Sequence, residues 1–460
     1  MKRIYFLLYI IIGIWIYLGN TDAAIMYFSV LPFHYALFRH FYAKGDLVLT
    51  CFSFILLLSM GINPVFFFLN LEKIQFESRP LSSLHITAWS YLSVYSHVFV
   101  FLIVIFFLNL RYRSKNSFNI VDYSISYLKK LVSGYNVSLK YNYYLYAGII
   151  LMSIITIWMY NHNIGILGLQ QRELPFHLTG FLFYLRRYVF GIIIIILYIK
   201  CSNKNYAFIA CAAYATIGGL TACSKSVPLI FLVPIICESF LTGHKLRGLS
   251  GLFLSIFLFA FISLSRNLIF QYDQVEYDIL AIVAFSWDAL KNVEASTYII
   301  DIMESFTGRF QGATKLVLSG LYHDLGVADL ISFYSGTSLG ILIPNFESQI
   351  FDIELPEDKA YGVSVGYMGT IVLLSSGSYL LSAIQGVFMF AVFRIMNRLV
   401  QKVFLIVSNP IIRFFFLGIV AYAVLNLTDG YPFSRMYIYI LILFVIYSFV
   451  LNKCKRLARI

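Results

Sequence analysis

Apolar runs, each about as long as a membrane is thick, recur along almost the whole of this chain. A helix needs about 20 mainly apolar residues to cross roughly 30 Å of hydrocarbon, and backbone groups in lipid must be paired within the protein. The expected fold class is therefore an all-α polytopic membrane protein with about twelve transmembrane helices. They are predicted near residues 4–19, 22–38, 47–69, 86–110, 143–160, 178–200, 206–221, 226–241, 249–266, 372–397, 410–427 and 433–451.

The composition agrees with this class and excludes most others. Hydrophobic residues make up 60% of the chain and charged residues 12%, and the mean hydropathy is +0.81, well outside the range of ordinary globular domains. The net charge of +12 would also suit a nucleic-acid partner. However, the basic residues lie in short segments beside apolar runs, where they set orientation and meet anionic headgroups. We therefore expect membrane lipid as a partner and no nucleic acid.

The distribution of basic residues sets the expected orientation. With twelve spans and both termini inside, most of the 34 lysines and arginines fall in inner segments, as the positive-inside rule requires. Pro32 and His34 interrupt the second apolar run, but without that span the basic segment 111–141 would face outward. The N-terminal run lacks a small-x-small cleavage site, so we expect an uncleaved first span rather than a secretory signal.

Residues 267–363 form a polar, acidic block in an otherwise apolar chain. They divide it into spans with short loops over 1–266, a large outer loop over 267–371, and further spans with a basic tail over 372–460. The loop carries 14 of the 22 carboxylates and four basic residues, a net charge of −10. Helical apolar spacing over 286–306 predicts a few helices lying over the membrane surface. Such a loop favours work at the outer face, although a solvated cap that only links two spans is the simplest alternative.

An arginine pair, Arg186 and Arg187, is predicted to lie inside a span. The apolar run 188–199 has only 12 residues, too few to cross, so the helix must include the pair. At 1.5 Å rise per residue, Arg187 would lie roughly a dozen ångströms below a helix start near residue 178. A charge at that depth costs about 2 to 3 kcal/mol and generally faces a polar cavity or an anionic partner. The alternative is snorkelling to the outer headgroups.

Further cations are expected at the outer ends of different helices. They are Arg172 before the sixth span, Lys225 in the turn Ser224-Lys225-Ser226, Arg266 at the end of the ninth span, Arg435 in the last outer turn, and Arg309, the sole arginine of the large loop. Each by itself also fits an interfacial anchor or an ordinary turn. Together they predict a cationic pocket for a pyrophosphate.

These segments resemble the Wzy-type O-antigen polymerases, also called oligosaccharide repeat unit polymerases. Members are described by an arginine followed by ten residues and a glycine in their outer loops, and Arg309 with Gly320 matches this spacing. The stretch from Arg172 to Gly180 is similar to the family's smaller loop, although it lacks the spacing because residue 183 is Phe. The turn around Lys225 is similar to one found in these polymerases and in the related O-antigen ligases.

The resemblance implies a GT-C-type glycosyltransferase of the bacterial inner membrane, with both termini cytoplasmic and the large loop periplasmic. Such an enzyme takes a glycan from undecaprenyl diphosphate and joins it to the nonreducing end of another lipid-linked repeat unit. The implied partners are the lipid-linked donor and acceptor and a chain-length regulator protein. The expected residues that bind the donor diphosphate are Arg172, Arg309 and Lys225, with Arg186, Arg187, Arg266 and Arg435 as further candidates.

Arginine suits this chemistry because its paired donors can stabilise the charge that grows on a leaving diphosphate. No Asp-x-Asp is present, only Asp352-Ile353-Glu354, so metal-assisted transfer is disfavoured and no cofactor is expected. The six cysteines have no C-x-x-C spacing, so neither a zinc site nor a disulfide framework is implied.

An inverting transfer needs a base for the acceptor hydroxyl, and we favour Glu173 and Asp324. Either could instead be the ion-pair partner of an arginine. The other outer candidates are His177, His323 and Asp429. Three further ionisable residues are given structural roles: His97 as a hydrogen-bonded core histidine, and Glu238 and Arg413 as anchors near inner span ends.

Two other functions stay open on the sequence. An O-antigen ligase has the same architecture and leaving group but delivers the finished polymer to lipid A core. A flippase for lipid-linked oligosaccharides also commonly has twelve spans, but it would be expected to have short loops and charges along a central passage. A purely structural or assembly role is the remaining alternative.

Overall fold

The structure is a computed structural model that describes part of the chain. The described residues are 2–72, 74–76, 79–111, 138–162, 190–222, 226–271, 313–321, 342–343, 363–364, 366–375 and 377–406, with the single residues 164, 178, 182, 186, 224 and 284. The chain forms two compact units. Unit 1 comprises Met1–Tyr123 and Phe306–Ile460, and unit 2 comprises Ser124–Ser305. These units are defined by contacts within the folded chain. The three segments expected from the sequence were defined instead by the change from apolar spans to a polar loop.

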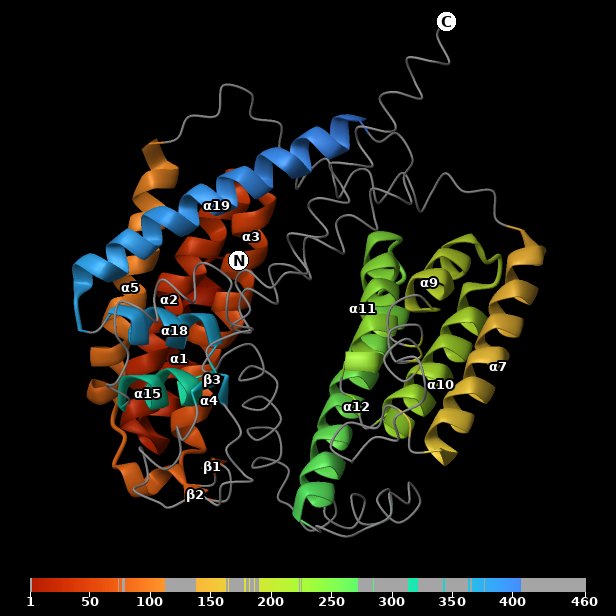
Figure 1. The fold of residues 1–460 in the computed structure, drawn as a ribbon, viewed down its shortest axis with the longest axis horizontal. Coiled ribbons are helices and arrows are strands. Elements are labelled where there is room, and N and C mark those ends of the chain that lie inside the picture. The colour runs from red at the N-terminus through yellow and green to blue at the C-terminus, as the bar shows by residue number, and fades with distance from the viewer. Residues whose placement is uncertain are drawn as a thin grey trace, which may run out of the picture. The chain divides into compact units, whose positions relative to one another are not determined.

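Unit 1 is mainly helical, and segments from both ends of the chain build it (Figure 1). Its helices are α1 (Lys2–Gly19), α2 (Thr21–Ala43), α3 (Leu47–Leu56), α4 (Asn63–Leu69), α5 (Ala88–Arg111), α15 (Ala313–Leu321), α18 (Gly366–Ser375) and α19 (Tyr379–Ile406), with a π-helix η1 (Leu57–Ile62) and a 3-10 turn η2 (Leu81–Leu84). Two antiparallel pairs of two-residue strands complete it: β1 (Gln75–Phe76) with β2 (Arg79–Pro80), and β3 (Leu342–Ile343) with β4 (Val363–Ser364).

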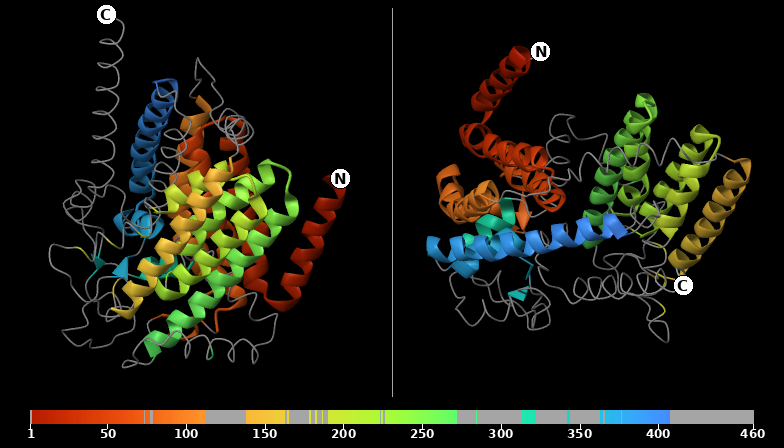
Figure 2. Two further views of the ribbon diagram at one scale, coloured as in Figure 1. Left: turned by 90° about the vertical axis from the view of Figure 1, so that its right-hand side faces the viewer. Right: turned by 90° about the horizontal axis from the view of Figure 1, so that it is seen from above.

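Unit 2 contains α7 (Leu139–Asn161), α9 (Phe190–Lys200), α10 (Lys204–Ala222), α11 (Ser226–Leu241) and α12 (Lys245–Gln271). Helices α10, α11 and α12 pack against one another, and α7 packs against α9 and α10 (Figure 2). Their shared core is apolar, and Tyr214 and Phe231 meet edge to face in it at 4.8 Å between ring centroids.

Polar residues cap the N-termini of several helices in the short polar segments between apolar runs. Asn20 accepts a hydrogen bond from the backbone N–H of Ala23, and Asp46 accepts one from that of Leu49. Ser138 caps α7 in the same way. Because the first N–H groups of a helix have no partner within it, these side chains fix where α2, α3 and α7 start.

Four helical segments of the described chain are long and apolar enough to cross a membrane: Leu47–Leu69, Ala88–Arg111, Leu139–Asn161 and Tyr379–Arg398. They overlap four of the spans predicted from the sequence. Helices α1, α2, α10, α11 and α12 also lie where spans were predicted, and α2 continues through Pro32. The spans predicted at 410–427 and 433–451 lie outside the described residues, and the total of twelve stays a prediction.

The tenth predicted span is divided differently in the structure. It was expected over 372–397, but α18 ends at Ser375 and α19 begins at Tyr379. The backbone N–H of Ser378 donates to the carbonyl of Ser375 at 2.7 Å, and Gly377 takes a positive φ of 76° that side chains rarely adopt. A glycine turn therefore separates the end of the large loop from the long helix.

A helix of the large loop is packed into unit 1. Ala313, Leu316 and Leu318 of α15 are at most 1% exposed, and α15 packs against α4, α5 and α18 (Figure 1). The sequence predicts that helices of this loop lie over the membrane surface. In the structure α15 is part of the hydrophobic core of unit 1, because its apolar face is covered by three neighbouring helices. The stretch 286–306, on which the prediction rests, lies outside the described residues, so it stays a prediction.

Candidate functional site

Two of the predicted site residues, Arg186 and Arg266, are among the described residues. The other predicted site residues lie outside them: Arg172, Glu173, Arg187, Lys225, Arg309, Asp324 and Arg435. The same holds for Arg413, His177, His323 and Asp429. The structure therefore bears on the predicted site through the helices and turns that flank these residues.

Arg186 lies in the interior of unit 2. Its side chain is 1% exposed. Snorkelling would place the guanidinium on the outer surface of the unit, so that alternative does not hold for Arg186. That this charge faces a polar cavity or an anionic partner stays a prediction.

The turn between α10 and α11 is tightly packed. Ser224 is 1% exposed, and its backbone N–H donates to the carbonyl of Gly219 at 3.1 Å. A Cβ added at Gly219 would lie 2.8 Å from both Ile262 of α12 and Pro228 of α11. Three helices therefore approach each other closely at this turn.

The approach at Gly219 also brings α12 beside the turn that contains Lys225. Arg266 lies one helical turn beyond Ile262 on α12, and Ile262 is fully buried against this turn. Two of the segments that the sequence expects around a pyrophosphate, the Ser224–Ser226 turn and the end of the ninth span, thus lie at the same end of unit 2.

Helix α15, which contains Gly320 of the Arg309–Gly320 spacing, contacts neighbouring helices at both of its ends. At the start of the helix, the backbone N–H of Ala313 donates to Oδ1 of Asn63 at 2.6 Å. At its end, a Cβ added at Gly320 would lie 2.2 Å from Cγ2 of Val94 in α5. The glycine of this pattern is therefore a close-packing position, and Arg309 precedes the start of α15 by four residues.

Sequence reasoning missed Asn63 as part of this region. Asn63 is fully buried at the first position of α4 and is followed by Pro64. An asparagine in the middle of a predicted span is a signal in itself, because buried amides in lipid need partners. The partner, 250 positions away, has no signal in the sequence.

A polar cluster joins α5 to α18 and α19 in unit 1. His97 makes a hydrogen bond to Ser382 at 3.0 Å and stacks on Tyr379 at 4.6 Å between ring centroids. Ser382 is also paired with Ser375 at 2.7 Å, which in turn accepts from Gln385 at 3.3 Å. The predicted role of His97 as a hydrogen-bonded histidine is confirmed, although the residue is only half-buried.

A fully buried histidine, His34, was not given any role in the sequence analysis. His34, 1% exposed, pairs through Nε2 with the hydroxyl of Tyr95 at 2.8 Å. Gly61 of the π-helix η1 faces it, and a Cβ there would lie 3.1 Å from that of His34. The close approach of α2 to η1 thus depends on a glycine.

Glu238 is not the interfacial anchor that the sequence predicts. Its carboxylate accepts a hydrogen bond from Nη2 of Arg247 at 3.0 Å, and both side chains are less than 10% exposed. The hydroxyl of Tyr198 donates to the same oxygen at 3.4 Å. Because α11 and α12 are neighbours, the acid finds a partner inside the protein rather than at the membrane surface.

Within the described ranges, no three His, Cys, Asp or Glu side chains lie close enough together to hold a metal ion. Comparison with known protein families, with curated proteins and with solved structures finds no match to this chain.

Proposed function

We propose that this chain is a glycosyltransferase of the bacterial inner membrane that polymerises lipid-linked oligosaccharide repeat units of O-antigen or a similar surface polysaccharide. In this proposal the chain has twelve spans in a GT-C-type arrangement, both termini are cytoplasmic, and the large loop is periplasmic. It takes the glycan from undecaprenyl diphosphate and transfers it to the nonreducing end of an acceptor repeat unit, assisted by a chain-length regulator protein.

The observation that carries the proposal is the packing of α15. The proposed function requires that the Arg309 segment be held rigidly, because a group that stabilises a transition state must be positioned before the reaction. The hydrogen bond from Ala313 to Asn63 and the contact of Gly320 with Val94 support this requirement. They fix the helix that begins four residues after Arg309.

The proposed site residues have two kinds of role. Arg172, Arg309 and Lys225 bind the donor diphosphate, and the further candidates for this role are Arg186, Arg187, Arg266 and Arg435. The proximity of α12 to the turn after α10 supports a shared role for Lys225 and Arg266. Glu173 or Asp324 is the general base.

The proposed reaction is a direct displacement at the anomeric carbon of the donor. The acceptor hydroxyl attacks this carbon, the base takes the hydroxyl proton, and the bond to the diphosphate oxygen breaks with inversion. The electron pair of that bond leaves on the diphosphate, whose added charge the arginines and Lys225 stabilise. In this proposal the residues of the chain supply the stabilising charge without a metal ion or a cofactor.

A gel of the host's lipopolysaccharide, before and after deletion of the gene, tests the reaction class. The proposal predicts that the ladder collapses to core plus a single repeat unit, and that the restored gene returns the ladder. Loss of every glycan-bearing band, the single unit included, would contradict polymerisation and point to a ligase or a flippase.

A further inference from the structure

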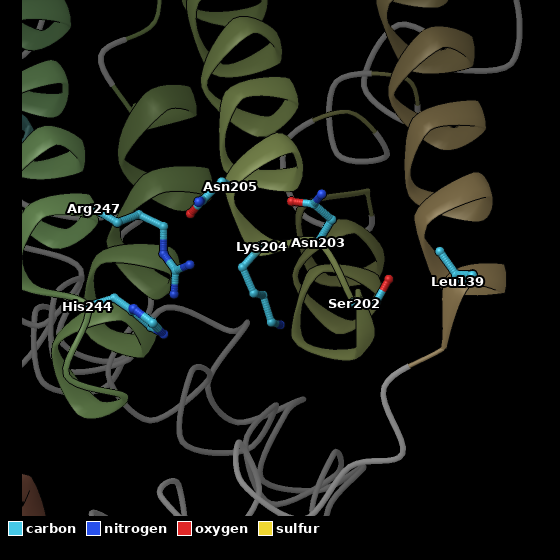
Figure 3. A pocket seen from close by; sticks show the side chains of 7 residues that line it. All are labelled: Leu139, Ser202, Asn203, Lys204, Asn205, His244 and Arg247. Carbon is cyan, nitrogen blue, oxygen red and sulfur yellow. The ribbon is translucent and has the colours of Figure 1, made fainter.

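An open cavity of about 520 Å³ lies at the end of unit 2 where α7, α10 and α12 begin. Seven residues line it: Leu139, Ser202, Asn203, Lys204, Asn205, His244 and Arg247. Figure 3 shows Arg247 and His244 reaching toward Lys204. None of these seven described lining residues is acidic, so the cavity presents cationic and neutral polar groups.

Two hydrogen bonds to residues of α11 hold the Arg247 guanidinium in place. Its Nε donates to the hydroxyl of Ser239 at 2.8 Å and its Nη2 to the carboxylate of Glu238 at 3.0 Å. Neither bond uses Nη1. Because the side chain is only 9% exposed and doubly anchored, its remaining donors are fixed at the wall of the cavity.

Lys204 is also fixed while it faces the cavity. Its ammonium donates to the carbonyls of Tyr198 and Ile199, the last turn of α9, the latter at 2.7 Å. An ammonium has three N–H donors, so these two bonds leave one for a ligand. Asn205 and His244 are exposed and complete the rim.

The surroundings of the cavity combine positive charge with apolar surface. Among the described residues at this end of unit 2 there are five basic side chains and one acid, Glu238; the basic ones are Lys140, Lys200, Lys204, Lys245 and Arg247. On the helices that flank the cavity, Leu139 is 67% exposed and Leu246 is 82% exposed. Anionic lipid headgroups are bound by basic pockets between helices, whereas a free phosphate would gain nothing from the apolar frame.

We propose that this cavity binds the headgroup phosphate of an anionic glycerophospholipid, whose acyl chains pack along Leu139 and Leu246. The cavity is separate from the proposed diphosphate site. The cavity lies at the start of α10, whereas Ser224 follows the end of that helix. The 19 residues of α10, at 1.5 Å rise each, place the two about 28 Å apart along the helix. The inference therefore stands independently of the proposed polymerase activity.

Native mass spectrometry of the full chain in detergent, titrated with phosphatidylglycerol or phosphatidylcholine, tests the inference. The test variant is N205D/H244E, which places two acids at the rim where the described side chains make no structural bond. An acid at Asn205 also suits the first turn of α10. The matched control is H162E, because His162 is an exposed histidine at the opposite end of α7.

We expect the wild-type chain and H162E to retain phosphatidylglycerol in preference to phosphatidylcholine. The double variant should bind phosphatidylglycerol on the order of tenfold more weakly, since each charge near an anionic surface changes binding severalfold. All three proteins should have the same elution profile, and the double variant should keep the wild-type unfolding temperature. Equal retention in the double variant would overturn the site, and displacement of the lipid by millimolar inorganic phosphate would overturn its assignment to a lipid headgroup.

Discussion

Gly320 of α15 packs against Val94 of α5 so closely that a Cβ on the glycine would lie 2.2 Å from the valine Cγ2. Two non-bonded carbon atoms cannot lie 2.2 Å apart, so a side chain at this position would force a helix or the valine to move. The contact ties the segment that follows Arg309 to a helix that is long and apolar enough to span a membrane.

Gly320→Ala should separate α15 from α5 and lower the stability of unit 1 by about 1 to 3 kcal/mol, the usual cost of overpacking. Polymer formation should fall with it. Val94→Ala removes both methyl groups that the new Cβ meets, so the double variant should recover part of the loss. A double-mutant cycle of thermal unfolding measures this coupling. Purely additive effects would contradict the packing of these two residues.

Asn63→Ala should free the start of α15, because the backbone N–H of Ala313 loses its acceptor at 2.6 Å. A buried donor without a partner costs about 1 to 3 kcal/mol. Hydrogen exchange at residues 313–321 should accelerate in this variant and stay unchanged in Asn20→Ala, whose bonds lie at the start of α2 and the end of α4. Unchanged exchange in Asn63→Ala would contradict the hydrogen bond.

The ion pair between Asp46 and Arg394 links the start of α3 to α19, with 2.8 Å between Nη1 of Arg394 and Oδ2 of Asp46. Arg394→Met should destabilise unit 1 by about 3 kcal/mol, because the Asp46 carboxylate, 4% exposed, loses its partner. Adding Asp46→Asn should recover much of this loss, since asparagine still caps α3. A double variant no more stable than Arg394→Met alone would contradict the pairing.

Stability should also depend on pH through Asp46. Burial raises the pKa of its carboxyl, and the Leu49 N–H and the Arg394 guanidinium offset this only in part. The folded protein therefore binds this proton more tightly than the unfolded chain, whose Asp pKa is about 3.9. Its contribution is present below that value and is lost as pH rises through the folded pKa. Unfolding measured across this pH window should lose that slope in Asp46→Asn, and an unchanged slope would contradict the assignment.

The buried pair of Glu238 and Arg247 predicts an asymmetry between single and double variants. Arg247→Met leaves a buried carboxylate and should cost about 3 to 5 kcal/mol, whereas Glu238→Gln with Arg247→Met should cost much less. Thermal unfolding of purified protein measures both. Equal destabilisation by the two variants would indicate that the carboxylate of Glu238 is solvated.

The helices were readable from the sequence because length and hydropathy are local properties. Residues 47–69 and 226–241 were predicted with the bounds that the structure gives. What could not be read was the pairing of residues far apart in the chain, such as Asp46 with Arg394. The prediction that Glu238 is an interfacial anchor was wrong for the same reason, since its pairing with Arg247 depends on how α11 packs against α12. Gly320 was noted for its spacing, but its role as a close contact needed the position of α5.

The most direct test of the proposed function is a polymerisation assay with the purified full chain in liposomes and synthetic undecaprenyl-diphosphate repeat units. Products should grow by successive repeat units with the wild-type protein. Arg309→Ala and Arg172→Ala should each slow growth about tenfold to a hundredfold, the effect of one lost charge-assisted hydrogen bond. Lys359→Ala, in the same loop, should retain wild-type growth. Full chain growth by both arginine variants at wild-type protein concentration would contradict the proposed function.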